Sequence, residues 1–398
     1  TVKKTPLDLF RLAMPFSREK KEQLELLGDA LAGCLDDVKY LLKQGRIKIE
    51  SCDYGVSAGM LSDSSFLRII PLADDKEIIS LVNGWNEKLL SDFKQKAFKE
   101  FSKHSKGLIE KHFAPEIVGM EHVKKAAILQ LFSKERFHIL LLGDPGTGKT
   151  GILRASEKYS PVSSFGLGSG TSSAGLTVSG AGDDMSKGLL AMAHNGICYL
   201  DELNLLKKED RSSLLNAMEK GFVTFDKGGK HLRFDANARV LATANPKGDS
   251  FVGVIPETLR QQMPFDPALV SRFHLVFLVR KHTAEEFRQI TKKIISDDKK
   301  EENKTSSAFI RDYVLFCEKQ DVSFDKKHQD AIMDFIEKIK KDEKKFIVEI
   351  GPRLVIGLIN IAKASARMQL KDKAEEADVK DAISIVEQSL YFRKEKNE

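Results

Sequence analysis

The feature that most constrains this chain is a short apolar run that leads into a glycine-rich turn. Residues 137–142 read Phe-His-Ile-Leu-Leu-Leu, which is too short for a membrane span and typical of a buried strand. The turn has the pattern G-x-x-x-x-G-K-T and consists of Gly143, Asp144, Pro145, Gly146, Thr147, Gly148, Lys149 and Thr150. A chance glycine turn is the alternative. The strand before it, the helix expected after it and the Lys-Thr pair together favour a phosphate-binding loop.

Such a loop sets the chemistry of its ligand. Glycines carry no side chain, so successive backbone N–H groups can turn inward and cradle phosphate oxygens. The helix that we expect to begin near Lys149 points its positive end at the same anion. We therefore expect ATP with Mg²⁺ as the bound pair. Lys149 would reach the β- and γ-phosphates, and the Thr150 hydroxyl would hold the metal.

The composition agrees with a folded protein of more than one domain. The chain has 398 residues, which favours two or three domains, and 41% of them are hydrophobic, which is enough for a proper core. The net charge of +6 permits an acidic partner such as nucleic acid. Lysine-rich runs at 299–304 and 337–345 are more typical of solvated faces than of binding sites.

The cysteines and the ends of the chain bear on its compartment. The four cysteines are scattered without C-x-x-C spacing, so we expect no zinc site and a reducing environment. We expect no membrane association, because no apolar stretch reaches membrane length and no signal peptide opens the chain. The first residue is Thr1 rather than Met, which suggests a trimmed or processed fragment. The expected location is cytoplasmic, in a prokaryote or mobile element, or nuclear in a eukaryote.

Residues 1–105 predict a small, mainly helical N-terminal module without a chemical motif. The expected elements are a helix at 18–42, strands at 46–51 and 65–70, and helical residues 76–104, continuous or broken near Gly84. Trp85 and Phe93 fall at helical spacing, which favours core packing over ligand contact.

Residues 106–283 predict an α/β core around the phosphate-binding loop. Ile117 and Val118 precede a helix at 121–132, and we interpret them either as a wall for adenine or as ordinary core. An apolar strand ends in Asp201 and Glu202, where Asp201 can hold Mg²⁺ and Glu202 can polarise the attacking water. Exposed acids at a strand end are the alternative, which the upstream loop disfavours. Asn245 follows another strand and either orders that water or forms an Asn-Pro turn.

Three more features bear on partners. Lys227 and Lys230 lie at the tip of a predicted β-hairpin, which is either a contact to nucleic acid phosphates or an ordinary solvated turn. Arg272, in a Ser-Arg-Phe triplet, is a candidate arginine finger for a neighbouring chain. Residues 284–398 predict a helical lid, in which Arg353 at a helix start either reaches back toward the nucleotide or is a surface arginine.

Taken in order, these motifs resemble the AAA+ ATPases and, among them, the minichromosome maintenance (MCM) helicases, over roughly residues 113–391. The segments that carry the resemblance are APEIVGMEHVKKAAILQLF, HILLLGDPGTGKT, GSGTSSAGLTV, NGICYLDELN, EDRSSLLNAMEKGFVT, LATANP, ALVSRFHLVF, PRLVIGLINIAKASARM and DVKDAISIVEQSL. The resemblance implies an AAA+ P-loop fold, with a parallel sheet covered by helices on both faces and a C-terminal α-helical lid.

The resemblance also implies roles at matching positions. Lys149 and Thr150 match Walker A, and Asp201 and Glu202 match Walker B. Asn245 matches sensor 1, Arg272 the trans-acting finger and Arg353 sensor 2. Lys227 matches a hairpin lysine that contacts DNA in the central channel of a ring.

The sequence also departs from the family pattern. The loop reads G-T-G-K-T where the family usually reads G-T-A-K-S, and Leu203-Asn204 replaces Phe-Asp after the Walker B pair. His274 replaces an aspartate, which we expect to alter an intersubunit contact. The insertion at 178–184 is short, and the zinc-bearing N-terminal region and the C-terminal winged helix have no counterpart here.

The leading hypothesis is an ATP-driven ring, a hexamer, that moves single-stranded DNA through its channel. ATP would lie between subunits, with Arg272 and Arg353 supplied by the next chain. A remodeller of protein partners, like the MoxR or chelatase relatives, is the alternative from another class, and the basic hairpin discriminates against it. A degenerate regulatory homologue is the third hypothesis, disfavoured because every hydrolytic residue is present.

Overall fold

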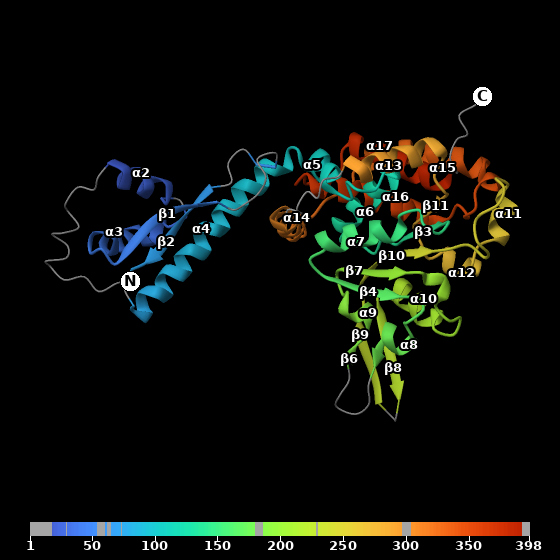
Figure 1. Ribbon diagram of the computed structural model, residues 1–398, viewed down its shortest axis with the longest axis horizontal. Coiled ribbons are helices and arrows are strands. Elements are labelled where there is room, and N and C mark those ends of the chain that lie inside the picture. The colour runs from blue at the N-terminus through green and yellow to red at the C-terminus, as the bar shows by residue number, and fades with distance from the viewer. Residues whose placement is uncertain are drawn as a thin grey trace. The chain divides into compact units, whose positions relative to one another are not determined.

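The structure is a computed structural model of the chain, and it describes residues 18–28, 30–53, 60–61, 65–72, 74–179, 186–227, 230–296 and 304–391 (Figure 1). The chain divides into two compact units, which are described separately. The first is Thr1–Lys103 with Lys304–Ser306, and the second is His104–Asn303 with Ser307–Glu398. Within the described ranges, every helix is too short or too polar to cross a membrane.

The first unit packs three helices against a two-stranded antiparallel sheet. Its elements are α2 (Arg18–Leu26), α3 (Leu35–Lys43), β1 (Ile47–Asp53), β2 (Ser65–Pro71) and α4 (Lys76–Ser102). Both expected strands are present, and α4 is continuous through Gly84. The helix expected at 18–42 is wrong as a single element, because it ends at Leu26 and α3 begins only at Leu35.

The core of this unit explains its elements. Trp85 of α4 is buried among leucines of α2 and α3, as expected for a core residue, while Phe93 is half-buried and lies against the ring of Phe66. The Asn86 side chain bonds the backbone N–H and carbonyl of Ile69, both at 2.8 Å, which fixes α4 to the edge of β2. The Asp75 carboxylate caps the first turn of α4.

The second unit is built on a parallel five-stranded sheet. Its strands are β3 (Ile139–Gly143), β4 (Ser163–Leu167), β7 (Ile197–Asp201), β10 (Arg239–Ala244) and β11 (Leu275–Val279). They lie in the order β11-β3-β10-β7-β4, so the strand before the glycine-rich turn, β3, is an inner strand between β11 and β10. Because all strands run the same way, the carboxyl ends of β3, β7 and β10, which lead into the phosphate-binding loop, the Asp201–Glu202 pair and Asn245, meet at one edge of the sheet.

Helices cover both faces of this sheet, which is why its strands are nearly continuous apolar runs. Leu140, Leu142 and Leu200 point to the face covered by α10 (Arg211–Lys220), α11 (Pro256–Gln261) and α12 (Pro267–Val270). The other face packs on α6 (Glu121–Leu131) and α7 (Lys149–Tyr159), where the Tyr199 hydroxyl meets Ser156 at 2.9 Å. This is the AAA+ P-loop arrangement that the sequence predicts.

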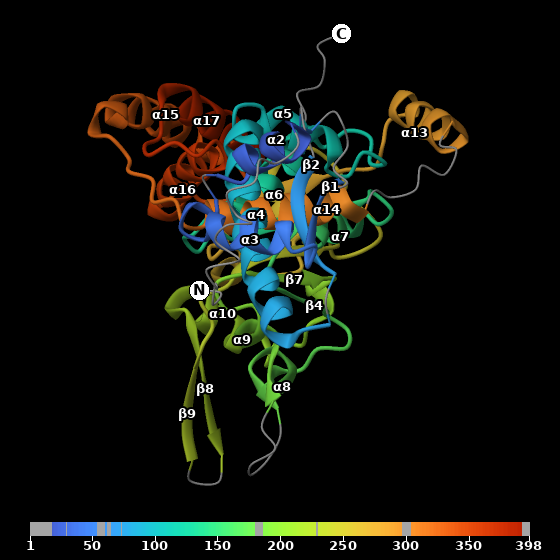
Figure 2. The same ribbon diagram turned by 90° about the vertical axis from the view of Figure 1, so that its left-hand side faces the viewer.

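Two short antiparallel hairpins leave the same side of the second unit (Figures 1 and 2). One pairs β5 (Val178–Ser179) with β6 (Ser186–Lys187), and residues 180–185 between them lie outside the described range. The other pairs β8 (Phe222–Lys227) with β9 (Lys230–Asp235). Lys227 is the last residue of β8 and Lys230 the first of β9, and the two residues pair across the hairpin.

The C-terminal part of this unit is the expected helical lid. Its helices are α13 (Ala284–Ser296), α14 (Lys304–Cys317), α15 (Gln329–Lys341), α16 (Pro352–Met368) and α17 (Glu376–Leu390). Arg367 of α16 is nearly fully buried and donates to the carbonyl oxygens of Phe132 at 2.7 Å and Gln320 at 3.1 Å. A buried guanidinium is stable only when its donors are satisfied, so these bonds fix α16 against the end of α6.

Candidate functional site

The glycine-rich turn forms an open cradle at the carboxyl edge of the sheet. Gly146 and Gly148 have φ angles of +75° and +86°, which residues with a Cβ rarely adopt. Gly143 lies so close to β11 that a Cβ there would stand 2.0 Å from the Val279 carbonyl oxygen. The turn therefore needs its glycines, and α7 begins directly after it, at Lys149. Its first N–H groups point at the cradle, as an anion site requires.

Lys149 folds over this turn. Its ammonium donates to the carbonyl oxygens of Gly143 at 2.8 Å and Asp144 at 2.6 Å, and to the Thr147 hydroxyl at 3.4 Å. Burial lowers the pKa of Lys149 to about 8, against the opposing pull of Asp144 and Asp201. The lysine is thus a cation held at low solvation inside the loop, and phosphate oxygens are the partners that would satisfy it best.

Asp144 has a structural part in the loop that the sequence pattern does not reveal. It is almost fully buried, and its carboxylate accepts from the backbone N–H of Phe251 at 2.7 Å and of Lys281 at 3.0 Å. These two bonds join the loop to the segment after β10 and to the chain leaving β11. The Asp144 side chain therefore holds the loop in place rather than facing a ligand.

Hydroxyl and carboxylate groups that could bind a cation lie beside the cradle. The Thr150 hydroxyl donates to Oδ1 of Asp201 at 3.2 Å, and the Thr243 hydroxyl donates to the same oxygen. Asp201 is 5% exposed. Oxygen ligands of this kind suit Mg²⁺, which binds through one or two protein groups and keeps waters and substrate phosphates as the others. The predicted metal residues Thr150 and Asp201 are thus brought together.

Glu202 and Asn245 lie next to this set. Glu202 has a φ angle of +53°, a strained conformation for a residue with a side chain, and its N–H donates to the Thr243 hydroxyl at 2.9 Å. The Asn245 N–H donates to the Asn204 side-chain oxygen at 2.9 Å. The structure places Lys149, Thr150, Asp201, Glu202 and Asn245 on strand ends and loops of a single edge.

Ile117 covers the start of α7. A Cβ added at Gly151 would meet its Cδ1 at 2.8 Å, and one added at Gly148 would meet its Cγ2 at 3.6 Å. Ile117 and Val118 are both half-buried. Ile117 therefore borders the cradle on the side where a base could lie, while nothing in the geometry distinguishes Val118 from ordinary packing.

Arg272 and Arg353 lie at the opposite edge of the sheet. Arg272 precedes β11, whose first residue, Leu275, pairs with Ile139, the first residue of β3. The five paired residues between this edge and Gly143 span roughly 15 Å. Arg353 donates to the Ser271 carbonyl oxygen, so it lies with Arg272. Within its own chain Arg353 therefore lies away from the cradle, and the interpretation that it reaches a nucleotide stays a prediction.

This edge carries a second charge cluster. The Arg272 guanidinium donates to the Glu219 carboxylate at 2.9 Å, and Arg136 donates to the Glu219 carbonyl oxygen at 2.6 Å. Burial and the charge of Arg272 lower the pKa of Arg353. Three arginines, Arg136, Arg272 and Arg353, therefore gather near the Glu219 carboxylate at this edge.

His274 lies beneath this cluster. It is 7% exposed, and its Nδ1 accepts from the His138 N–H at 3.0 Å. Burial, followed by the charges of Arg353 and Arg136, lowers the pKa of His274 to about 4. The side chain of His274 bonds inside its own chain, and the expectation that it alters an intersubunit contact stays a prediction. A neutral imidazole is the form that can accept this bond beside several arginines.

The hairpin prediction is confirmed for the backbone only. Lys227 pairs with Lys230 across β8 and β9, but the side chains of residues 225–231 lie outside the described set. The described base of the hairpin is polar, with Ser213, Asn216, Lys220 and Thr224 lining a shallow hollow. Arg233 lies with its guanidinium carbon 3.8 Å from the centre of the Phe222 ring.

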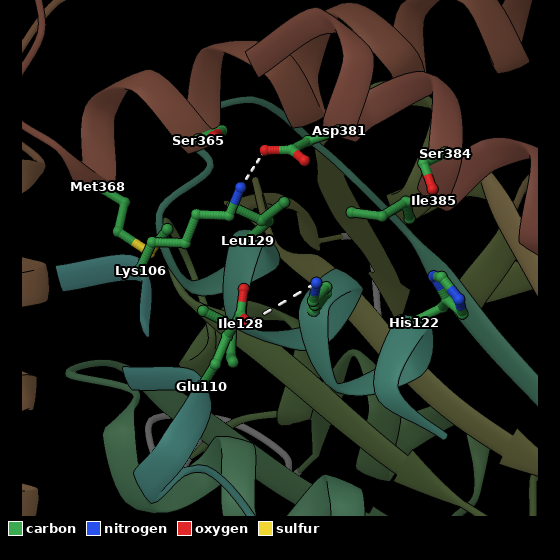
Figure 3. A pocket seen from close by; sticks show the side chains of 11 residues that line it. Lys106, Glu110, His122, Ile128, Leu129, Ser365, Met368, Asp381, Ser384 and Ile385 are labelled. Atoms are coloured by element: carbon green, nitrogen blue, oxygen red, sulfur yellow. Dashed lines mark hydrogen bonds and ion pairs between the residues drawn. The ribbon is translucent and has the colours of Figure 1, made fainter. Parts of the chain in front are cut away.

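Another hollow lies between the lid and the core, away from the cradle (Figure 3). An ion pair between Lys106 and Asp381 crosses it, and Lys125 and Glu110 approach to 3.7 Å at its floor. None of the predicted site residues lines it. This hollow belongs to the junction of α5 (Ser105–His112), α6, α16 and α17, and not to the phosphate site.

Comparison with protein families agrees with this geometry. The family model of the MCM P-loop domain matches residues 94–298, and that of the MCM AAA-lid domain matches residues 308–390. The chain belongs to the MCM family. The match covers the cradle, the strand-end carboxylates, Arg272 and, in the lid, Arg353.

Several curated MCM proteins are similar to the chain over most of its length. The minichromosome maintenance protein MCM of Saccharolobus solfataricus is 28% identical over 76% of this chain and 47% of its own length. The DNA replication licensing factor mcm4 of Schizosaccharomyces pombe is 28% identical over 71% of this chain and 35% of its own. The licensing factor mcm5-A of Xenopus laevis is 26% identical, over 71% and 43%. The chain thus spans less than half of each of these relatives.

Sequence reasoning missed three residues of the site. Thr243 joins Asp201 to Glu202, yet inside a strand it reads as an ordinary β-branched residue. The sequence signal that could have pointed to Thr243 is its position two residues before Asn245. The structure adds that its strand, β10, pairs with the Walker B strand β7. Glu219 and Arg136 approach Arg272 only through tertiary packing, which no spacing in the sequence indicates.

Proposed function

We propose that the chain is the motor part of an ATP-dependent DNA translocase of MCM type, which hydrolyses ATP between the subunits of a ring. The observation that carries the proposal is the division of the predicted site between two edges of one sheet. Lys149, Asp201 and Glu202 lie at the carboxyl edge, and Arg272 and Arg353 lie about a strand's length away. A complete set forms only when the arginine edge of one copy meets the cradle of another.

The residues divide the chemistry between them. The loop N–H groups and Lys149 bind the phosphates, and Thr150 with Asp201 would hold Mg²⁺, which neutralises charge on the β- and γ-oxygens. Glu202 polarises the attacking water and Asn245 orients it. Arg272 and Arg353 of the neighbouring copy stabilise the charge that develops on the γ-phosphate, a contribution of about 10³-fold or more in related phosphoryl transfer.

In this proposal the hairpins contact the nucleic acid. The β5–β6 and β8–β9 hairpins project from the same side, and their strands include the basic residues Lys187, Lys227 and Lys230. We propose a hexameric ring with single-stranded DNA in its channel, contacted through phosphates by Lys227 and Lys230. Changes in the γ-phosphate contacts would move these hairpins relative to the lid.

The decisive experiment measures ATPase activity over a range of protein concentrations, with and without single-stranded DNA. We expect the specific activity to rise with concentration and with DNA. Glu202→Gln should abolish turnover while keeping nucleotide binding. Lys227→Ala with Lys230→Ala should remove the stimulation by DNA and keep the basal rate.

Two outcomes contradict the proposal. Specific activity that does not depend on protein concentration excludes a site shared between copies. DNA stimulation that persists in the Lys227→Ala, Lys230→Ala variant excludes the hairpin as the DNA contact and favours a remodeller of protein partners. An inactive wild-type chain that still forms rings would be a regulatory homologue.

A further inference from the structure

Helix α13 has an apolar side that its own chain leaves exposed. Phe287, Ile290 and Ile295 fall on one side of the helix, and Glu285, Gln289 and Lys292 on the other. Phe287 is 63% exposed and Ile295 80%. Figure 2 shows α13 standing apart from the other helices of the second unit. Amphipathic helices normally turn such a side to a core, whereas among the described residues of α13 Phe287 and Ile295 are turned to solvent and Ile290 is half-buried.

The beginning of α13 is tied to the cradle. The Lys281 N–H donates to Asp144 of the phosphate-binding loop at 3.0 Å, and the capping box of Thr283 and Glu286 starts the helix two residues later. Arg280, one residue before Lys281, donates to the carbonyl oxygens of Phe251 and Gly253. Helix α13 thus rises from the carboxyl edge of the sheet.

The same edge carries a second exposed apolar segment. Val252, Val254 and Ile255 are 68%, 55% and 59% exposed. Arg280 holds this segment through its bonds to the carbonyl oxygens of Phe251 and Gly253. The segment is therefore fixed in a conformation that exposes these apolar side chains. Exposed apolar side chains that lie together mark an interaction surface, whereas single scattered ones do not.

We infer that the apolar side of α13 docks on a second copy of this chain, at the edge that carries Arg272 and Arg353. The inference rests on the proposed function, because only that edge must face the cradle to complete the site. Ile356 follows Arg353 by three residues on α16, so it lies on the same side of that helix, and it is 51% exposed. If Arg353 reaches the cradle of a neighbouring copy, Ile356 comes close to that copy as well. Such a head-to-tail contact generates a ring where the rotation between successive copies closes.

The first test measures self-association of the full chain in the presence of ATP and Mg²⁺, by sedimentation velocity, for the wild type and for Phe287→Ser with Ile295→Ser. Both positions are exposed, so the monomer should keep its fold and its melting temperature. We expect the concentration at half-assembly to rise about tenfold or more, from the lost burial of two large apolar side chains. Leu26→Ser, at a position 73% exposed in the first unit, is the matched control and should leave assembly unchanged.

The second test locates the contact. Copies with Phe287→Cys are mixed with copies with Ile356→Cys under mild oxidation, and disulfide-linked pairs are counted on denaturing gels. Linked pairs in the mixture, above the level of either variant mixed with wild type, support the inference. Wild-type assembly with unchanged association of the serine variant and no linked pairs overturns it and leaves the shared ATP site standing. A wild-type chain that stays monomeric and hydrolyses ATP at every dilution overturns both.

Discussion

The guanidinium of Arg353 donates a hydrogen bond to the carbonyl oxygen of Ser271, the residue directly before Arg272. This bond joins the lid to the amino edge of the sheet and makes the two arginines neighbours. A Cβ at Gly357 would stand 3.0 Å from Cβ of His274, so α16 approaches this edge closely along its first turns. The lid therefore holds Arg353 beside Arg272, at the edge of the sheet opposite the cradle.

This arrangement predicts complementation between two inactive variants. Lys149→Ala removes the cradle cation and Arg272→Ala removes the finger, so each variant alone should lose nearly all ATPase activity. In an equal mixture, about a quarter of the contacts between random neighbours pair an intact cradle with an intact arginine edge. We expect activity to return to about that fraction of the wild-type rate, measured after the two proteins are assembled together. Absence of any recovery in mixed rings would mean that Lys149 and Arg272 of one and the same chain serve a single site.

Thr243 should act as a positioning residue for the metal. Its hydroxyl bonds both the Asp201 carboxylate and the Glu202 N–H, so Thr243→Val leaves two buried polar groups without that partner. We expect the Mg²⁺ concentration for half-maximal ATPase activity to rise about tenfold, as for other outer partners of metal ligands.

Thr243→Ser is the control for this prediction, because it keeps the hydroxyl and loses only a methyl group. It should recover most of the Mg²⁺ affinity. If the valine and serine variants need the same Mg²⁺ concentration as the wild type, the hydroxyl has no part in holding Asp201.

The strands and lid helices could be predicted from the sequence because their patterns are local. Continuous apolar runs mark β3, β7, β10 and β11, and the helix start expected at Arg353 agrees with α16, which begins at Pro352. The helix expected at 18–42 is wrong for a physical reason. Leu24, Leu27 and Leu31 have helical spacing and are buried, but Gly28 and Gly33 weaken the helix between them. The leucines reach the core through a turn and a 3₁₀ segment at Ala32–Cys34.

The cradle could be predicted because backbone geometry and residue type coincide in one short segment. The second edge could not, since Arg136, Glu219 and Arg353 come from distant parts of the chain. Only the parallel register of β3 and β11 shows that Arg272 lies a strand's length from Lys149. His274 shows the same limit. It follows the Ser-Arg-Phe triplet, which suggested a residue at an intersubunit contact, but α16 packs on it and buries it.

Nucleotide affinity should depend on the protonation of Lys149. Its pKa is lowered to about 8 by burial, so the ammonium is mostly charged at pH 7 and mostly neutral at pH 9. Phosphate binds the charged form, and the dissociation constant should therefore rise about tenfold between these two pH values. The measurement is equilibrium binding of a fluorescent ATP analogue. Lys149→Arg keeps its charge throughout and should show no such rise, and an equal rise in both proteins would assign the effect to another group.

His274 should make the fold sensitive to acid. The unfolded chain takes up a proton on this histidine near its ordinary pKa of 6.5, whereas the folded chain does so only near 4. Stability therefore falls as pH falls between these values, by about 3 kcal/mol for this residue. His274→Asn retains an acceptor for the His138 N–H without a titratable proton, so its urea midpoint should fall less between pH 7 and 4.5. His104→Gln, at an exposed histidine, should keep the wild-type slope. Equal slopes in all three proteins would show that His274 is not the residue whose burial opposes the proton.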